Sequence, residues 1–343
     1  KEAGSNTAAL VSSRLPAENI YAFKQLFDNH LHARTVANIE ENLTTSNLEE
    51  VNLLGNLEDL KQADCVFVIG ADLVKSHQVA GFFVKRNRPN GVRIIVADPY
   101  ENQMESVAQF SLHPAAGSDV ELLKGLTAGV VNLGYNKNGA EDIDPQAITL
   151  AANATGIPAE TLVAISRELG AAERPVIVFG KGITQALNGN LKALEELARA
   201  TGARLINPMG KTNSAAVHFY GLDKAFNPSG HALVYLALGD DFPTPRLEKT
   251  IAAALAGPQK PLLVIQTSHL SPLAEQADVL LPVEMWSELE GHFLNLEGRL
   301  QQVHKVIDAM PMVRSNGAVF QSLAGALNAE LDEAWQPALL VHN

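Results

Sequence analysis

The sequence predicts an α/β protein with mostly parallel sheets. Continuous apolar runs at residues 65–69 and 176–179 are bounded by polar residues or glycine, the pattern of parallel strands that are covered on both faces. Segments of helical periodicity separate these runs, so strands and helices alternate along the chain. A length of 343 residues is enough for about two domains, each with its own core.

Charge and cysteine content exclude several classes of function. The chain carries 26 basic and 38 acidic residues, a net charge of −12, which disfavours nucleic acid and anionic membrane surfaces as partners. Its one cysteine allows neither an internal disulfide nor an iron–sulfur cluster, which needs about four thiolates. No apolar run approaches the roughly 20 residues of a membrane span, so we expect a cytoplasmic protein without direct membrane insertion. The first residue is Lys rather than Met, and we expect a piece of a longer chain.

The first predicted helix begins near Pro16, a residue that the first turn of a helix tolerates. Apolar residues and a histidine then recur at helical spacing: Ile20, Phe23, Phe27 and His30. His30 and His32 could be taken for a pair of metal ligands, but no cysteine or carboxylate accompanies them, which favours a structural role.

A predicted βαβ unit follows residues 38–63, a polar stretch in which we expect a loop and one short helix. Its strands are residues 65–69 and 92–96, and the helix between them carries three apolar residues, Val79, Phe82 and Phe83. A right-handed crossover places the connecting loops at the carboxyl edge of the sheet, where α/β proteins bind ligands. We therefore expect Gly70 and Asp72, which follow the first strand, to lie at that edge.

Asp98 follows the second strand of this unit. In doubly wound folds an acid at this place often bonds a ribose hydroxyl, but such an acid can also cap a helix. Cys65 lies inside the first strand, which favours packing in the core over reactivity.

Gly117 and Asp119 open the next predicted helix, and by themselves they indicate a capped turn. One face of this helix is apolar: Val120, Leu123, Leu126 and Val130. A further helix is expected to begin at Pro158 and to end at Gly170.

A glycine turn follows the predicted strand at residues 176–179. Gly180 and Gly182 allow a tight turn whose backbone amides face an anion, although the third glycine of a dinucleotide fingerprint is absent. The next helix buries three leucines before Gly202: Leu191, Leu194 and Leu197. Further buried strands are expected at residues 232–238 and 262–266.

The segment from residue 275 to residue 301 holds a second polar cluster. Its apolar run at residues 279–281 predicts a buried strand that ends at Pro282. Farther on, an amide, a carboxylate and a guanidinium surround one glycine: Asn295, Glu297, Gly298 and Arg299. These residues can form a solvated turn or hold a polar ligand, and spacing alone leaves both alternatives open.

The sequence of this segment resembles a known family. Ala-Asp-Val-Leu-Leu-Pro, followed by Glu-x-x-Gly-x-Phe-x-Asn-x-Glu-Gly-Arg-x-Gln, is similar to a block of the molybdopterin oxidoreductase superfamily. That superfamily includes formate dehydrogenases, periplasmic nitrate reductases and the large iron–sulfur subunit of bacterial NADH-quinone oxidoreductase (respiratory complex I). Its Asn-x-Glu-Gly-Arg form looks most like the complex I branch. Other blocks match near Ser13, Asp98, Gly117 and Gly180, so the resemblance covers roughly residues 13–301.

The resemblance implies two nested, Rossmann-like, three-layer subdomains with mostly parallel sheets, as in formate dehydrogenase-like domains. Residues 38–206 would form the inserted subdomain, residues 1–37 plus 207–330 the discontinuous one, and residues 331–343 a tail. In relatives the cleft between the subdomains carries a bis-pterin cofactor. The cysteine-rich amino-terminal region of the family and its carboxyl-terminal β-barrel are absent from this sequence.

The resemblance also implies a pterin dinucleotide site, vestigial or actual, and the Asp at position 119 contacts guanine in relatives. The cofactor-binding residues that it implies are Gly70, Asp72, Asp98, Gly117, Asp119, Gly180, Gly182, Gln185, Asn213, Asn295, Glu297 and Arg299.

Two departures from the family pattern argue against molybdenum chemistry. After an arginine matched by Arg34, catalytic members carry a Cys, selenocysteine or Ser that ligates the metal, whereas this chain has Thr35 and Val36. Met209 stands where formate dehydrogenases place an arginine beside the substrate. We therefore expect no catalytic and no metal-ligating residue in this chain.

The resulting expectation is the molybdopterin-oxidoreductase-like portion of the large iron–sulfur subunit of complex I. It would support electron transfer from NADH through iron–sulfur clusters to quinone, with no cofactor of its own and with the clusters in the missing amino-terminal part. Its partners would be other subunits of a respiratory complex, which would hold it peripheral to the inner membrane. The alternative is a fragment of a formate dehydrogenase-type enzyme that binds molybdopterin guanine dinucleotide, and a third alternative is an apo dinucleotide-binding module.

Overall fold

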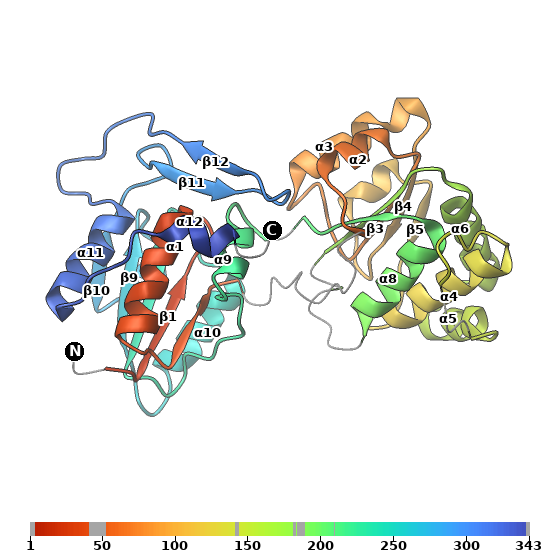
Figure 1. The fold of residues 1–343 in the computed structure, drawn as a ribbon. Helices are drawn as coiled ribbons and strands as arrows, with labels where there is room; N and C mark the ends of the chain where they lie inside the picture. The colour runs from red at the N-terminus through yellow and green to blue at the C-terminus, as the bar shows by residue number, and fades with distance from the viewer. Residues whose placement is uncertain are drawn as a thin grey trace. The chain divides into compact units, whose positions relative to one another are not determined.

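A computed structural model describes residues 4–40, 53–140, 144–180, 183, 189–208 and 210–340, apart from the side chains of residues 338 and 340. The chain divides into two compact units. Unit 1 comprises Lys1–Leu43 and Gly210–Asn343, and unit 2 comprises Thr44–Met209 (Figure 1). These boundaries fall a few residues later than those expected from the sequence.

Unit 1 contains a five-stranded parallel sheet in the order β10-β9-β8-β1-β2. Its strands are β1 (Thr7–Val11), β2 (Thr35–Asn38), β8 (Leu233–Gly239), β9 (Leu262–Thr267) and β10 (Val279–Pro282). An antiparallel hairpin, β11 (Gly291–Leu294) and β12 (Leu300–Val303), follows in the chain. The strand order makes unit 1 a doubly wound sheet, because the chain moves outward in one direction from β1 and in the other from β8.

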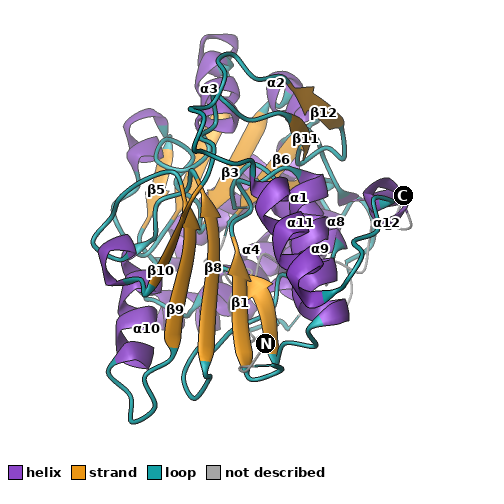
Figure 2. Ribbon diagram, turned by 90° about the vertical axis from the view of Figure 1, so that its left-hand side faces the viewer, coloured by secondary structure: helices purple, strands orange, loops and turns teal. Residues whose placement is uncertain are grey.

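Helices cover both faces of this sheet (Figure 2). They are α1 (Ala17–Lys24), which continues as a π-helix over Gln25–His30, α9 (Ser214–Phe219), α10 (Pro245–Leu255), α11 (Asn316–Leu327) and α12 (Trp335–Leu340). On one face Leu10 and Leu236 pack in a core with Ile251 of α10. On the other face, the ring centroids of Phe27 and Tyr235 lie 4.7 Å apart. Alternate residues of β8 therefore pack against helices on opposite faces of the sheet.

Unit 2 contains a second five-stranded parallel sheet, in the order β5-β4-β3-β6-β7. Its strands are β3 (Cys65–Ile69), β4 (Arg93–Ala97), β5 (Phe110–Leu112), β6 (Pro175–Phe179) and β7 (Arg204–Ile206). The helices are α2 (Leu57–Gln62), α3 (Gln78–Arg86), α4 (Asp119–Asn132), α5 (Ala147–Thr155), α6 (Ala159–Ala171) and α8 (Asn190–Thr201). Short 3-10 turns at Arg88–Asn90, Gln103–Val107 and Ala274–Gln276 complete the described helical segments of the two units.

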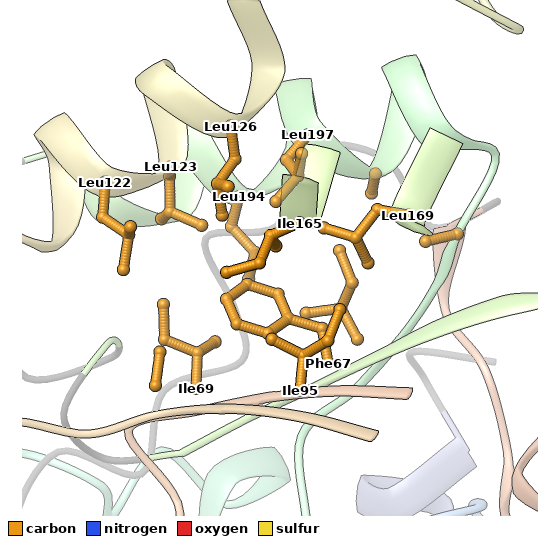
Figure 3. Packing of buried hydrophobic residues seen from close by; sticks show 14 of the residues in the cluster. Phe67, Ile69, Ile95, Leu122, Leu123, Leu126, Ile165, Leu169, Leu194 and Leu197 are labelled. Carbon is orange, nitrogen blue, oxygen red and sulfur yellow. The ribbon is translucent and has the colours of Figure 1, made fainter. Parts of the chain in front are cut away.

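The core of unit 2 lies between its sheet and the helices α4, α6 and α8 (Figure 3). Strand residues Phe67, Ile69 and Ile95 meet a layer of aliphatic helix residues: Leu122, Leu123, Leu126, Ile165, Leu169, Leu194 and Leu197. All of these side chains are buried. Continuous apolar strands are the expected consequence of a parallel sheet that is covered on both faces.

The α/β class and the main buried strands are confirmed, as are the helices expected near Pro16, Asp119 and Pro158. The helix expected before Gly202 is confirmed as α8, with Gly202 in a left-handed conformation at its end, although Leu191 is only partly buried. Cys65 is fully buried in β3, and burial raises the pKa of its thiol to about 12, which agrees with a packing role.

Two expectations were wrong. Residues 279–281 do not form a buried strand, because β10 is an edge strand that pairs only with β9 and leaves Val279 and Leu280 exposed. Gly170 does not end its helix: it lies inside α6, where a Cβ would approach the Tyr135 ring to 2.5 Å. The capped turn expected at Gly117 and Asp119 is present with Ser118 as the N-cap residue of α4, whose hydroxyl donates to the carbonyl of Ala115 at 2.6 Å.

Candidate functional site

The carboxyl edge of the unit 2 sheet brings several of the sequence-predicted residues together. The strand order reverses between β3 and β6, and doubly wound sheets bind ligands at such a switch point. Gly70 and Asp72 follow β3, Asp98 follows β4, and Gly180 follows β6. Because all these strands are parallel, their carboxyl ends share one edge.

Gly180 is held against the loop after β3. Its N–H donates to the carbonyl of Ile69 at 3.1 Å, and a Cβ at this position would lie 2.4 Å from the carbonyl oxygen of Gly70. Gly180 therefore allows the two loops at the switch point to pack closely, which explains its presence without a ligand. Gly182 and Gln185 lie outside the described residues.

Asp72 and Asp98 use their carboxylates within the protein. Asp72 accepts hydrogen bonds from the N–H groups of Val74 and Lys75 at 3.0 and 3.1 Å. Asp98 accepts from the N–H of Tyr100 at 3.0 Å and from the amide of Asn102 at 3.1 Å. Both acids fix turns. Asp98 does not cap a helix, the alternative that the sequence left open, because the N-cap of the following 3-10 turn is Asn102. A ribose contact by Asp98 and a cofactor contact by Asp72 stay predictions.

Asp119, the first residue of α4, differs from these two acids. It is half-buried, and within the described ranges the hydrogen bond to its carboxylate comes from its own N–H alone. Burial raises the pKa of this carboxyl, and the negative charge of Asp98 adds to the rise. Gly117 has a left-handed φ of 84°, and a Cβ added there would meet open space. A partly desolvated carboxylate with spare acceptor capacity can receive two N–H or O–H donors from a ligand.

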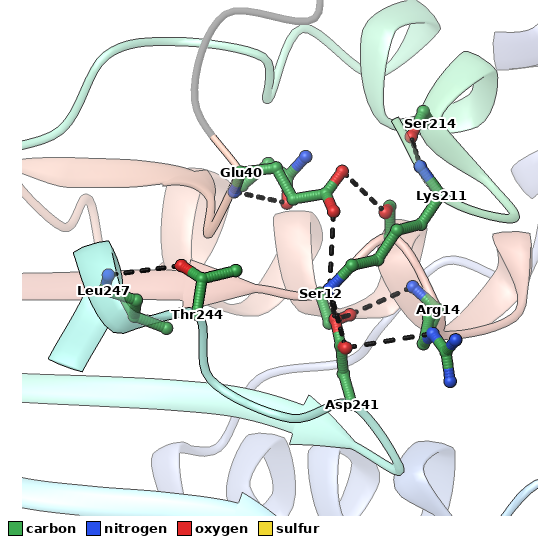
Figure 4. Close-up of polar contacts among 10 residues, drawn as sticks. Ser12, Arg14, Glu40, Lys211, Ser214, Asp241, Thr244 and Leu247 are labelled. Atoms are coloured by element: carbon green, nitrogen blue, oxygen red, sulfur yellow. Dashed lines mark hydrogen bonds and ion pairs between the residues drawn. The ribbon is translucent and has the colours of Figure 1, made fainter. Parts of the chain in front are cut away.

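A polar cluster lies at the corresponding edge of unit 1, where its sheet changes direction between β1 and β8 (Figure 4). Asp241 is its centre and is buried. Its carboxylate accepts from the hydroxyl of Ser12 at 2.6 Å and from the ammonium of Lys211 at 2.6 and 2.7 Å. Glu40 lies 3.4 Å from the same ammonium, and the guanidinium of Arg14 lies 3.7 Å from Asp241.

Two cations and two carboxylates balance in this cluster, so it joins the loops after β1, β2 and β8 without leaving excess positive charge for an anion. Sequence reasoning missed it. Asp241 follows a predicted strand, but nothing local in the sequence shows that residues 12, 40, 211 and 241 meet. The order of β1, β2 and β8 in the sheet brings residues 12, 40 and 241 together, and Lys211 reaches them from the segment that re-enters unit 1.

Asn213 is fully buried and fully engaged in unit 1. Its amide donates to the carbonyls of Leu15 and His292 at 3.0 and 3.1 Å, and its oxygen accepts from the N–H of Leu294 at 2.8 Å. It therefore ties the β11 strand to the loop after β1. A ligand contact of Asn213 stays a prediction.

The cluster at Asn295, Glu297 and Arg299 forms the turn of the β11–β12 hairpin. The oxygen of Asn295 accepts from the N–H groups of Glu297 and Arg299 at 3.0 and 2.9 Å, and Gly298 has a φ of 76°. The side chains of Glu297 and Arg299 are exposed. The geometry accounts for the asparagine and the glycine through turn chemistry, while ligand binding by this cluster stays a prediction.

The segment matched to the family's metal-ligand position lies inside strand β2. Val36 is buried there, and the hydroxyl of Thr35 lies 3.2 Å from a ring nitrogen of His231. Neither residue is at the carboxyl end of β2, where Ile39 and Glu40 follow the strand. The match at Val36 is therefore poorly placed for a ligand, and it carries little weight against metal chemistry. Met209 lies outside the described residues.

Within the described residues, no group of three or more His, Cys, Asp and Glu side chains is arranged to hold a metal ion. None of the described helices is by itself long and apolar enough to cross a membrane. The pair α5 and α6 passes such a test only when joined across a bend of 116°.

Comparison with known families decides the relationship. The family model described as molybdopterin oxidoreductase matches residues 1–326. The chain belongs to the molybdopterin oxidoreductase family. It is 25% identical over 334 residues to the F420-dependent formate dehydrogenase 2 subunit alpha of Methanococcus maripaludis, a match that covers 81% of this chain and 49% of that protein. It is 22% identical over 352 residues to a nitrate reductase of Symbiobacterium thermophilum, with 80% and 46% covered.

Among solved structures, acetylene hydratase from Pelobacter acetylenicus shares the fold, with a TM-score of 0.70 at 15% identity. That match covers 97% of this chain and 56% of the hydratase chain. The chain thus spans about half the length of the curated relatives described above. Formate dehydrogenase alpha subunits recur among the relatives, so the formate dehydrogenase alternative is better supported than the complex I interpretation.

Proposed function

We propose that this chain is the part of a formate dehydrogenase-type molybdopterin oxidoreductase that binds the nucleotide end of molybdopterin guanine dinucleotide. Family membership and the formate dehydrogenase relatives support the class of enzyme. One observation carries the role of this chain. Asp119 presents a half-buried carboxylate with unused acceptor capacity at the carboxyl edge of the unit 2 sheet.

The chemistry of guanine fits this carboxylate. The N1–H and the exocyclic amine of guanine are adjacent donors, and a carboxylate offers two oxygens that only accept. Partial burial strengthens such bonds because few waters compete for them. When bound, the molybdopterin would supply a redox-active metal for two-electron chemistry, while Asp119 would hold the guanine.

The first test is guanine binding by the purified chain. GDP titrated calorimetrically should bind Asp119→Asn at least about tenfold more weakly than the unaltered chain, because an amide accepts one hydrogen bond where the carboxylate accepts two. IDP, which lacks the exocyclic amine, should lose most of this difference. Glu160→Gln is the matched control, because Glu160 is an exposed acid in the first turn of α6. Equal affinity of GDP for the unaltered chain and Asp119→Asn would refute the assignment.

A second test asks whether the natural protein contains the cofactor and oxidises formate. The complete natural polypeptide should contain molybdenum or tungsten together with a released oxidised pterin, and should reduce a dye with formate. Metal and pterin without formate-dependent reduction would keep the cofactor proposal and reject formate as substrate. Absence of both metal and pterin, with iron and sulfide present, would instead favour the large iron–sulfur subunit of complex I, an interpretation whose basis is the Asn295 to Gln301 match.

The partner subunits depend on whether the chain belongs to a formate dehydrogenase or to complex I. In either branch the chain would act with other subunits of a respiratory or redox assembly, which would hold it peripheral to the inner membrane. Co-purification of the tagged natural polypeptide, followed by identification of stoichiometric partners, distinguishes the branches. NADH-oxidising subunits would favour complex I, and their absence would favour a formate dehydrogenase.

A further inference from the structure

A cavity of about 390 Å³ opens at the amino edge of the unit 2 sheet. Its described lining residues are Lys61, Phe83, Arg86, Asn87 and Asn90. They come from the last turn of α2, the end of α3 and the 3-10 turn that follows α3. These segments directly precede β3 and β4, so the cavity lies at the edge opposite Asp72, Asp98 and Asp119.

Hydrogen bonds fix the wall of this cavity. Asn87 is buried, and its amide donates to the carbonyl of Ala63 at 2.7 Å and to that of Leu60 at 3.4 Å. Its oxygen accepts from the amide of Asn90 at 3.0 Å. Asn87 therefore ties the end of α2 to the end of α3, and the cavity is preformed and needs no ligand to order it.

Two cationic side chains line the cavity in a strongly acidic chain. Lys61 and Arg86 both line it, no described carboxylate is among its lining residues, and the whole chain has a net charge of −12. The ammonium of Lys61 lies 4.9 Å from the centroid of the Phe83 ring and 2.5 Å from the carboxylate of Glu58. The guanidinium of Arg86 lies 5.7 Å from the centroid of the neighbouring Phe82 ring, so an aromatic ring adjoins each of the two cationic groups.

We propose that this cavity binds a small anion that carries a flat apolar group, such as an aryl phosphate or an aromatic carboxylate. Lys61 and Arg86 would contact the anionic oxygens, and Phe83 would pack against the flat group. Glu58 and the carbonyl ends of α2 and α3 compete for the same cations, so the expected dissociation constant is about a millimolar. This site is separate from the nucleotide site proposed above, and either can fail without the other.

Phenyl phosphate is the probe for this proposal, and the readouts are calorimetry and the side-chain amide signals of Asn87 and Asn90 in nuclear magnetic resonance spectra of the full chain. The double variant Lys61→Gln with Arg86→Gln should weaken binding at least about tenfold. The control, Lys124→Gln with Lys192→Gln, removes the same charge from exposed positions on α4 and α8. All four side chains are on exposed positions, so both double variants should keep the melting temperature of the unaltered chain.

Inorganic phosphate and benzylamine separate the contributions of the negative charge and of the aromatic ring to the binding affinity. Phenyl phosphate should bind more tightly than inorganic phosphate, and benzylamine should not bind. Equal affinity in the two double variants, or no saturable binding of phenyl phosphate to the unaltered chain, would overturn the proposal. So would binding that leaves the amide signals of Asn87 and Asn90 unchanged.

Discussion

At the scale of single residues, two buried carboxylates in unit 1 accept bonds from groups that are far away in the sequence. Asp241 receives the hydroxyl of Ser12 and the ammonium of Lys211. Glu284 receives the backbone N–H of Asn316 at 3.0 Å, while the amide oxygen of Asn316 accepts from Gln266 at 2.7 Å. Each acid therefore joins loops that follow different strands. For each acid, the direction in which replacement by its amide changes the free energy of unfolding can be predicted.

Asp241→Asn should lower the free energy of unfolding of unit 1 by about 2 kcal/mol. The amide loses the charge that compensates Lys211 and can accept fewer bonds in a buried place, whereas Lys211 itself keeps partial access to water. Urea denaturation monitored by circular dichroism measures the change. Asp308→Asn removes an acid from an exposed pair with Lys305 and should leave the midpoint unchanged. Equal midpoints for the two variants would contradict this role of Asp241.

Glu284→Gln should stabilise unit 1 at neutral pH. Burial raises the pKa of Glu284 in the folded chain above the unfolded value, despite the hydrogen bonds from Asn316 that lower it. The folded state then binds more protons than the unfolded state between these two pKa values, so stability falls as pH rises through that window and stays lower above it. Glutamine removes this dependence and can still accept the N–H of Asn316.

The measurement for Glu284 is the urea midpoint between pH 4 and pH 8. The difference between Glu284→Gln and the unaltered chain should grow with pH and then level off. Glu275→Gln, at an exposed position, should follow the unaltered chain at every pH. A difference that shrinks as pH rises would show that the sign is wrong.

At the scale of elements, the loops that follow β3 and β6 decide the shape of the unit 2 edge. Gly180→Ala should destabilise unit 2 by about 1–3 kcal/mol, because the new methyl group would lie 2.4 Å from the backbone oxygen of Gly70 and one of the loops must move. It should also weaken GDP binding if the edge shifts as a whole. Thermal unfolding and the GDP titration are the measurements.

Gly325→Ala is the control for that substitution. Gly325 lies inside α11, does not have a positive φ, and has open space around its added Cβ. Alanine there should raise the stability of unit 1 by about 0.5–1 kcal/mol through helix propensity. If both glycine variants changed stability in the same direction, the packing explanation for Gly180 would fail.

The elements also show what sequence reasoning can reach. Strands such as β3 and β6 were predictable because burial on both faces makes their residues uniformly apolar. The strands β5 and β7 were missed because three residues leave too little pattern, and β1 and β2 were missed because they contain alanine, which is uncommon in strands. The strand β10 was misjudged because an apolar run does not reveal whether its strand has one neighbour or two. Boundary errors at Gly170 have the same origin in tertiary packing.

The candidate site also has one part that could be predicted from the sequence and one part that could not. The edge position of Asp72 and Asp98 followed from the alternation of strands and helices, whereas Asp119 was indicated by the family resemblance, because the strand before it, β5, was missed. Which of the three keeps a free carboxylate could not be predicted, because turn bonds from Tyr100 and Val74 depend on loop conformation. The cluster around Asp241 needed the order of strands in space, which one sequence does not supply.

At the scale of the whole molecule, the chain leaves unit 1 once and returns to it once. Unit 2 is one continuous segment with its own core, so residues 44–209 should fold alone. The fragment should show a cooperative thermal transition and dispersed amide signals, and should keep GDP binding that Asp119→Asn weakens. The control is residues 1–43 expressed alone, which lack β8 and should be unstructured. A disordered 44–209 fragment would contradict its independence.

The nesting also sets the order in which a ribosome can complete the two units. Strand β1 emerges first, yet its hydrogen-bonding neighbour β8 begins only at Leu233, after all of unit 2 has been made. Unit 2 can close from contacts within itself while β1 and β2 wait as an incomplete sheet with an open edge. Stalled or truncated synthesis would therefore leave a folded unit 2 attached to an amino-terminal segment with an unpaired strand edge. Chaperones would be required to protect this segment from aggregation.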